Sequence, residues 1–170
     1  MFFIRKANLE DYADIAAIHF KSWHAAYLGL LPTSYINDKN NLCKKTKMWE
    51  TLVARPDVII WIASDTHHNN LGFIGYFIDN KGYEITTLYV LPDYQVLGIG
   101  TQLMTASLQA LLESHANAHV SLWVLESNVA AINFYQKFGF VDSSEKSEER
   151  YKNTQIIDVK MVRKLDDLTS

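Results

Sequence analysis

Two glycines near the middle of the chain, Gly98 and Gly100, have a spacing that suits the binding of a phosphate group. They follow a run rich in β-branched residues and precede a stretch with helical periodicity, so we expect them where a strand passes into a helix. Glycines at such a junction let successive backbone N–H groups curve around an anion, and the positive end of the helix dipole adds to the attraction. The segment 95–101 is therefore a candidate phosphate-binding loop.

The spacing of these glycines distinguishes the loop from two common nucleotide-binding loops. A dinucleotide-binding loop, G-x-G-x-x-G, needs a small residue at position 103, where this chain has Leu103. A nucleoside triphosphate loop, G-x-x-x-x-G-K-[ST], needs a lysine after its second glycine, and Thr101 stands there. The remaining pattern, Q-x-x-G-x-G, also fits a glycine turn that only starts a helix, and the residues alone leave both interpretations open.

The elements that must position this loop follow from hydrophobic periodicity and from turn residues. We predict strands at residues 2–5, 58–64, 71–78, 83–90, 120–125 and 155–162, and helices after Asn8 and at residues 33–37, 45–53, 100–114 and 129–138. Asn8, with Asp11 three residues later, has the pattern of a capped helix start. The charged segment 143–150 is expected to be a solvated loop. This order predicts an α+β (mixed α/β) fold with helices on the faces of a sheet.

Length, charge and cysteine content restrict the class of protein. A chain of 170 residues with no internal repeat is expected to form one domain over residues 1–170. Its net charge of −3 disfavours nucleic acid as a partner. The single cysteine, Cys43, excludes an internal disulfide framework and fits a reducing compartment. No apolar run approaches the about 20 residues of a membrane span, so we expect a cytoplasmic protein with no membrane partner.

Three blocks in the right order resemble the GNAT (Gcn5-related N-acetyltransferase) family. Leu88–Gly100 is similar to the family's fourth strand and its [RQ]-x-x-G-x-[GA] pyrophosphate loop. Ser127–Phe140 is similar to the family helix S-N-x-x-A-x-x-x-Y-x-x-x-G-F. Ser22–Pro32 resembles the acceptor-side helices of many members that act on small substrates. With the predicted strands and helices, the resemblance covers most of the chain.

The resemblance implies a fold, a co-substrate and a set of contacts. It implies a central, mostly antiparallel twisted sheet of six to seven strands, with helices on both faces. It implies transfer of an acetyl group from acetyl-CoA to a primary amine of a small molecule, protein or peptide, by direct attack in a ternary complex. The residues implied to bind acetyl-CoA are Tyr89, Val90, Leu91, Gln95, Val96, Leu97, Gly98, Ile99, Gly100, Thr101, Asn128 and Tyr135.

Within that set, the resemblance gives particular roles to a few backbone and side-chain groups. In relatives a bulge opens the edge of the fourth strand, the pantetheine arm pairs with it, and the Val90 N–H would face the thioester oxygen. Asn128 would bind pantetheine, although asparagine there is also a good helix N-cap. The loop departs from many relatives because it has no lysine or arginine, so the diphosphate would depend on backbone donors and the helix dipole.

Acetyl transfer also needs a proton acceptor for the amine and a proton donor for the departing thiolate. Glu84 lies eleven residues before Gln95, which is the position of the catalytic glutamate in the histone-acetylating branch, and Glu126 or a water molecule is the alternative base. Tyr135 coincides with the family tyrosine and is the candidate acid, since a phenol can donate to a thiolate. An alternative interpretation of Tyr135 is a core aromatic residue.

The acceptor side is less specified by the sequence. Trp23 and Tyr27 lie one turn apart on a predicted helix and either pack in the core or, with Glu84, line the acceptor site. The adjacent His67 and His68 lack the spacing of metal ligands, so no metal is expected. A homodimer through the C-terminal strands is a further expectation. The alternative to an enzyme is a non-catalytic acetyl-CoA-binding sensor or regulatory module.

Overall fold

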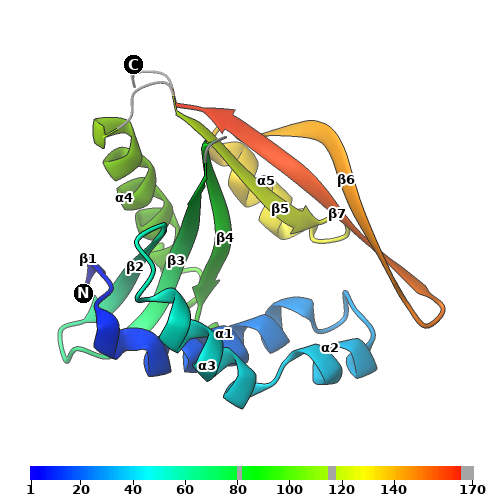
Figure 1. Cartoon of the computed structure of the whole chain (residues 1–170), viewed down its shortest axis with the longest axis horizontal. Helices are drawn as coiled ribbons and strands as arrows, with labels where there is room; N and C mark the ends of the chain where they lie inside the picture. The colour runs from blue at the N-terminus through cyan, green and yellow to red at the C-terminus, as the bar shows by residue number, and fades with distance from the viewer. Residues whose placement is uncertain (80–81, 115–117, 166–170) are drawn as a thin grey trace.

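A seven-stranded mixed sheet forms the centre of the fold in the computed structural model, which describes residues 1–79, 82–114 and 118–165 (Figure 1). The strands lie in the order β1-β2-β3-β4-β5-β7-β6, and neighbours are antiparallel except for the parallel pair β4 and β5. This arrangement confirms the predicted α+β fold with a mostly antiparallel sheet. The strands are β1 (Phe2–Lys6), β2 (Val58–Asp65), β3 (Asn70–Asp79), β4 (Gly82–Val90), β5 (His119–Leu125), β6 (Val141–Tyr151) and β7 (Thr154–Lys164).

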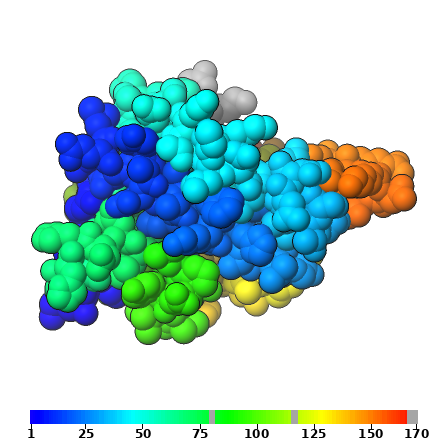
Figure 2. Space-filling view, turned by 90° about the horizontal axis from the view of Figure 1, so that it is seen from below, coloured from blue at the N-terminus to red at the C-terminus, as the bar shows by residue number. Residues whose placement is uncertain are grey.

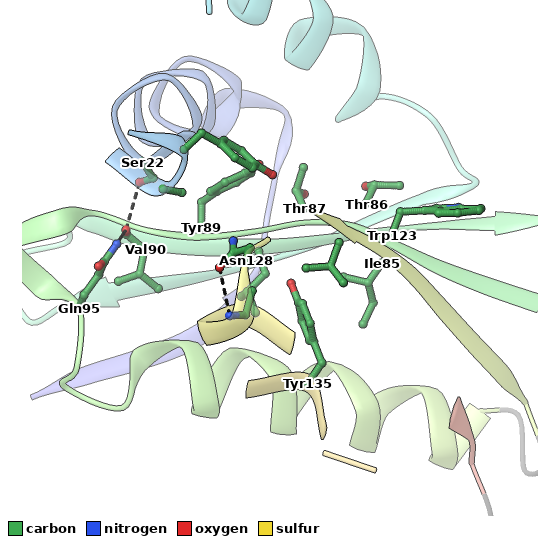
Figure 3. A pocket seen from close by; sticks show the side chains of 15 residues that line it. Ser22, Ile85, Thr86, Thr87, Tyr89, Val90, Gln95, Trp123, Asn128 and Tyr135 are labelled. Atoms are coloured by element: carbon green, nitrogen blue, oxygen red, sulfur yellow. Dashed lines mark hydrogen bonds between the residues drawn. The ribbon is translucent and has the colours of Figure 1, made fainter. Parts of the chain in front are cut away.

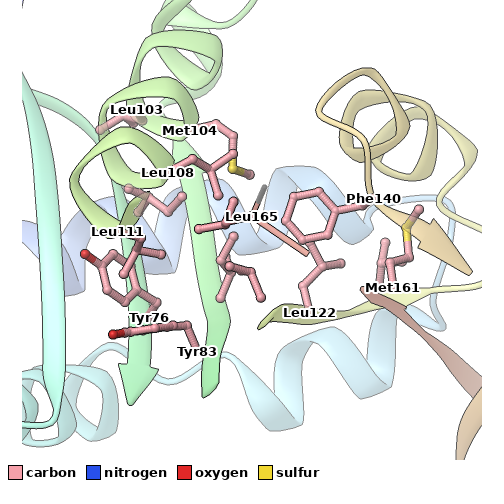
Figure 4. Packing of buried hydrophobic residues seen from close by; sticks show 14 of the residues in the cluster. Tyr76, Tyr83, Leu103, Met104, Leu108, Leu111, Leu122, Phe140, Met161 and Leu165 are labelled. Carbon is pink, nitrogen blue, oxygen red and sulfur yellow. The ribbon is translucent and has the colours of Figure 1, made fainter. Parts of the chain in front are cut away.

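Helices cover both faces of this sheet, as predicted. On one face Ile15 of α1 and Trp49 of α3 pack against Phe73 of β3, and Figure 2 shows these N-terminal helices from outside. On the other face Leu103 of α4 belongs to the main core. Phe140, which follows α5 in the chain, belongs to the same buried cluster (Figure 4). Among the described residues, no helix is long and apolar enough to cross a membrane. The helices are α1 (Tyr12–Tyr27), α2 (Thr33–Lys39), α3 (Leu42–Leu52), α4 (Ile99–Ser114) and α5 (Val129–Lys137).

The first helical segment begins at the predicted cap. The Asp11 carboxylate accepts the backbone N–H of Asn8 at 2.7 Å, and the Asn8 side chain accepts the N–H of Glu10 at 2.9 Å. Asp11 also accepts two guanidinium N–H groups of Arg5, each at 2.8 Å. Because Arg5 belongs to β1, these bonds join the start of the helical segment to the edge of the sheet.

A β-bulge in β4 opens the sheet at its centre. Gly75 of β3 pairs with Thr87, but the next residue of β3 pairs with Ile85, so Thr86 is the extra residue. Its hydroxyl donates to the Gly75 carbonyl at 3.3 Å. The bulge reverses the alternation of side chains, and Glu84 therefore shares a sheet face with Thr87.

Pairing between β4 and β5 ends at this bulge. The parallel ladder joins only residues 83–85 of β4 to residues 120–122 of β5. Beyond it the two strands diverge, so residues 86–90 of β4 have an edge that β5 does not cover (Figure 1). An open strand edge inside a sheet offers backbone hydrogen bonds to an extended ligand.

The expectation of a solvated loop at residues 143–150 was wrong, because β6 extends over Val141–Tyr151. It pairs with β7 in a long hairpin whose end extends beyond the rest of the molecule (Figures 1 and 2). As the last strand of the sheet, β6 is exposed along most of its length, so neither of its faces needs apolar residues. Charged side chains on an edge strand also discourage pairing with other chains, and here they conceal the strand pattern in the sequence.

Candidate active site

A cavity of about 190 Å³ lies where β4 and β5 diverge (Figure 3). Its walls come from α1, β4, β5 and α5, which are distant in the sequence, and from Gln95 in the segment between β4 and α4. The cavity is therefore a product of the bulge and of the helices that close it from both sides of the sheet. It is lined by Ser22, Ala26, Tyr27, Ile85, Thr86, Thr87, Leu88, Tyr89, Val90, Gln95, Trp123, Val124, Asn128, Ala131 and Tyr135.

The candidate phosphate-binding loop follows this cavity and leads into α4. Val96 and Gly98 have φ values of 59° and 81°, and no atom outside the neighbouring residues lies within 4 Å of the site of a Gly98 Cβ. The first N–H of α4 to be bonded within the helix is that of Gln102, which donates to the Gly98 carbonyl at 3.0 Å. In the described residues, no hydrogen bond uses the N–H groups of residues 96–101. The loop can thus offer a row of free backbone donors to an anion.

Val90 connects this loop to the open edge of β4. The Leu91 N–H donates to Leu71 of β3 at 2.8 Å, so by alternation the N–H and carbonyl of Val90 point away from β3. The Val90 carbonyl accepts the Ser22 hydroxyl at 3.1 Å and the Gln95 side-chain amide at 3.2 Å (Figure 3). These two bonds fix the strand end, and they leave the Val90 N–H on the open edge, as its predicted role requires.

Two predicted residues of α5 reach the cavity together. Asn128 caps the helix, because its side-chain oxygen accepts the Ala131 N–H at 3.2 Å, and it lines the cavity as well. The Tyr135 ring packs edge-on against Phe134 and Phe140, while its hydroxyl points from α5 toward β4 (Figure 3). No hydrogen bond in the described residues uses that hydroxyl. The packing and chemical interpretations of Tyr135 thus apply to different ends of one side chain.

Tyr135 is one of three tyrosines in the cavity wall, with Tyr27 and Tyr89. Burial is the largest cause that raises the pKa of each phenol. Tyr27 further raises the pKa of both Tyr89 and Tyr135, which indicates that the three hydroxyls lie near one another. All three phenols therefore keep their protons near neutral pH and can act as hydrogen-bond donors.

Behind Tyr89, the buried side chains of His19, Lys45 and Trp49 support the tyrosines of the cavity wall. The His19 ring stacks on Tyr89 with centroids 4.9 Å apart, and Lys45 Nζ lies 5.1 Å from the ring centroid of Trp23. His19 and Lys45 are only 7% and 8% exposed. The Trp49 indole N–H donates to His19 Nδ1 at 3.0 Å, and His19 Nε2 lies 3.1 Å from Lys45 Nζ.

Counting protons in this group indicates that Lys45 is uncharged when all these contacts are made. An indole N–H can only donate, so His19 Nδ1 is an acceptor and a neutral His19 ring carries its proton on Nε2. Lys45 must then accept from Nε2, which only a neutral amine can do. Burial lowers the pKa of Lys45 to about 8, and burial together with Lys45 lowers the pKa of His19 to about 3. His19 is therefore uncharged near neutral pH, and the lowered pKa of Lys45 makes the uncharged amine that these contacts require easier to reach.

The predicted bases lie outside the cavity. Glu84 lines an adjoining hollow of about 340 Å³ with Ser121 and Lys160, and Trp123 borders both spaces. Glu126 is exposed and forms an ion pair with Lys146 at 2.6 Å. Of the predicted site residues, the cavity brings together Tyr27, Tyr89, Val90, Gln95, Asn128 and Tyr135, whereas Trp23 lies behind Tyr27, with ring centroids 4.9 Å apart.

The sequence patterns did not identify several residues of the cavity. Thr86 and Thr87 belong to the bulge, whose position depends on pairing with β3 and has no glycine or proline signal. Trp123 was assigned only to a strand. Successive side chains of a strand point to opposite faces of the sheet, so the apolar Leu122, which is buried, indicates that Trp123 points to the opposite face.

Comparisons with known proteins agree with this geometry. A model of the acetyltransferase (GNAT) family matches residues 18–140. The uncharacterized N-acetyltransferase YuaI of Bacillus subtilis is 30% identical over 140 residues, which cover 79% of this chain and 78% of that protein. The PaiA N-acetyltransferase from Thermoplasma acidophilum, solved in complex with coenzyme A, superposes with a TM-score of 0.78 at 23% identity, covering 96% of this chain and 99% of that chain. The spermidine/spermine N-acetyltransferase SpeG from Vibrio cholerae superposes with a TM-score of 0.70 at 16% identity, covering 96% and 92%.

Proposed function

We propose that this chain, which belongs to the acetyltransferase (GNAT) family, transfers the acetyl group of acetyl-CoA directly to a primary amine within a ternary complex. The family supplies the reaction class, an enzymatic acetyl transfer with acetyl-CoA as co-substrate. One observation supports the finer proposal most strongly. The Tyr135 hydroxyl and the edge of β4 that carries the Val90 N–H meet at one cavity, next to a loop with free backbone donors.

The features of the site fit acetyl-CoA part by part. The free N–H groups of residues 96–101 and the N-terminal end of α4 suit the pyrophosphate, without any cationic side chain in the loop. The uncovered edge of β4 beyond Thr86 suits the amide groups of the pantetheine arm, and Asn128 offers its side-chain amide. A thioester at the end of this arm would lie in the cavity between Val90 and Tyr135.

Two groups of the chain then assist the transfer. The Val90 N–H would stabilise negative charge on the carbonyl oxygen, an effect worth about 3 kcal/mol for a fixed donor in other enzymes. Tyr135, protonated because burial raises its pKa, would give its proton to the departing thiolate. Glu84 could receive a proton from the amine only from the hollow on the far side of Trp123, by way of a water molecule.

The site also supports one domain over residues 1–170. Strands from β1 to β7 belong to the same sheet, and the cavity takes residues from α1 near the start of the chain and α5 near its end. The proposed reaction therefore needs nearly the whole chain.

A thiol-release assay tests the proposal. Purified protein with acetyl-CoA should release CoA thiol only when an amine is added, and mass spectrometry should find the acetylated amine. The panel should contain diamines and polyamines, amino acids, aminoglycosides and peptides. Binding of acetyl-CoA without release for any amine, with the folded state confirmed, would contradict the proposal.

A further inference from the structure

Asp158 of β7 lies on the sheet face that looks toward α1 and α2. Ile156, two residues before it, belongs to a buried cluster on that face, with Tyr35 of α2 and Leu125 of β5, against which Tyr27 packs. Side chains alternate along a strand, so Asp158 faces the same side as Ile156. Its direct cross-strand partner on β5 is Leu125, another member of the cluster.

The Asp158 carboxylate has no partner of its own. It is half-buried, and no hydrogen bond or ion pair in the described residues uses it. The nearby cations are engaged elsewhere: Lys160 pairs with Glu145 at 3.1 Å, and Lys39 pairs with Glu149 at 3.1 Å. Tyr35 donates to Glu149 at 2.8 Å, so this hydroxyl is used as well. A half-buried charge without a partner is costly, and such a group indicates a ligand of opposite charge.

The position of Asp158 connects it to the cavity through Tyr27. Tyr27 lines the cavity, and the charge of Asp158 raises the pKa of this phenol and of Tyr35, so the carboxylate lies close to both. Burial, and then Glu149, raises the pKa of Asp158 itself. The groups that face it are therefore Tyr27 on α1, Tyr35 on α2 and Glu149 on β6. No cation among the described residues lowers that pKa.

We propose that Asp158 binds the acceptor as an ammonium ion beside Tyr27 and accepts its first proton. This inference rests on the proposed acetyl transfer and adds its acceptor class and a catalytic residue. The ammonium ion loses one proton to Asp158 and becomes a neutral amine. The nitrogen lone pair forms the bond to the acetyl carbon, the carbon–sulfur bond breaks, and the thiolate takes the second nitrogen proton by way of Tyr135. Asp158 returns the first proton to water, so the sum is ammonium plus acetyl-CoA giving amide, CoA thiol and one proton.

The surroundings of Asp158 also restrict the acceptor. A free amino acid would place its own carboxylate next to its ammonium group, and therefore near Asp158 and Glu149. A diamine or a peptide amine has no such carboxylate. The acceptor class is thus a cationic primary amine without an adjacent carboxylate.

The substitution Asp158→Asn tests this inference, because it keeps the shape of the side chain and removes the charge. We expect kcat/KM for 1,4-diaminobutane to fall by ~10²-fold, the usual contribution of a general base. The difference in kcat/KM between Asp158→Asn and the wild type should become smaller as the pH approaches the amine pKa of about 10, where much of the amine is already neutral in solution. The melting temperature should stay equal or rise, since an unpaired half-buried charge is removed, and acetyl-CoA affinity should not change.

Two matched variants and one binding measurement complete the test. Glu148→Gln, on the outer face of the same hairpin, should behave like the wild-type protein, and Glu84→Gln should lose less activity than Asp158→Asn. Calorimetry with CoA present should show 1,4-diaminobutane binding that weakens at least ~10-fold in Asp158→Asn, and much weaker binding of alanine. Unchanged turnover in Asp158→Asn, or unchanged diamine binding, would overturn the assignment of Asp158. A wild-type protein that binds the diamine but releases no thiol would instead contradict the proposed acetyl transfer and leave Asp158 as an amine-binding residue.

Discussion

Removing one oxygen atom from Tyr135 separates its chemical role from its packing role. In Tyr135→Phe the ring keeps its contacts with Phe134 and Phe140, whose centroids lie 5.5 and 6.1 Å away. The lost hydroxyl makes no hydrogen bond in the described residues, so the free energy of unfolding should change by less than about 0.5 kcal/mol. For a domain of this size, that corresponds to a shift in melting temperature of less than about 2 °C.

The effect of the same change on acetyl transfer should be much larger. Loss of a general acid typically lowers the rate by ~10²-fold, which corresponds to about 2.7 kcal/mol of transition-state stabilisation. The assay is a single-turnover measurement of CoA thiol formation, because slow product release could hide a defect in the chemical step. Tyr12→Phe, a tyrosine of α1 outside the cavity, is the control for loss of a hydroxyl.

Either of two results would refute the reasoning about Tyr135. A single-turnover rate equal to that of the wild type would show that the hydroxyl donates no proton to the thiolate. A fall in melting temperature of several degrees, together with a small change in rate, would show that the hydroxyl has a structural role that the cavity geometry does not explain.

Three further predictions concern the loop and the buried pair. Gly98→Val should weaken CoA binding at least ~10-fold by calorimetry, because valine is strained at a φ of 81° and its side chain would enter the anion site. The control is Gly29→Val, which is equally strained at a φ of 83° but lies away from the loop and should leave CoA affinity intact. Lys45→Met should keep wild-type stability in urea unfolding to within about 1 kcal/mol, whereas Lys45→Arg should lose at least about 2 kcal/mol, and the reverse order would contradict an uncharged Lys45. The pKa of His19 is about 3 in the folded protein and 6.5 in the unfolded chain, so between these pH values only the unfolded chain binds the proton. The free energy of unfolding should therefore fall as the pH is lowered from 6.5 toward 3. His19→Gln should reduce this pH dependence, and His24→Gln, at an exposed position, should keep it.

The sequence carried enough information for the loop, the caps and most of the fold. The glycine spacing located the loop, and Asn8 and Asn128 act as the helix caps that their residue type indicates. These features depend on residues within a few positions of one another, which is why local patterns can predict them.

The features that the sequence could not supply depend on contacts across the sheet. Glu84 lies before the bulge at Thr86, in the part of β4 that still pairs with β5, so counting eleven residues back from Gln95 finds it but does not place it in the cavity. β6 lacks an apolar face because it is an edge strand. Asp158 becomes noticeable only when the hairpin brings it close to Tyr27, more than a hundred residues earlier in the chain.

Direct transfer from acetyl-CoA to an amine is the central claim, and one rapid-mixing measurement tests it. The protein is mixed with one equivalent of acetyl-CoA, and the free thiol is measured. 1,4-Diaminobutane is then added, the thiol is measured again, and the products are identified by mass spectrometry. Direct attack in a ternary complex predicts no thiol before the amine is added, then one thiol and one acetylated amine for each acetyl-CoA. Release of thiol before the amine, with an acetyl group left on the protein, would contradict the account, and so would the absence of thiol after addition of any amine of the panel.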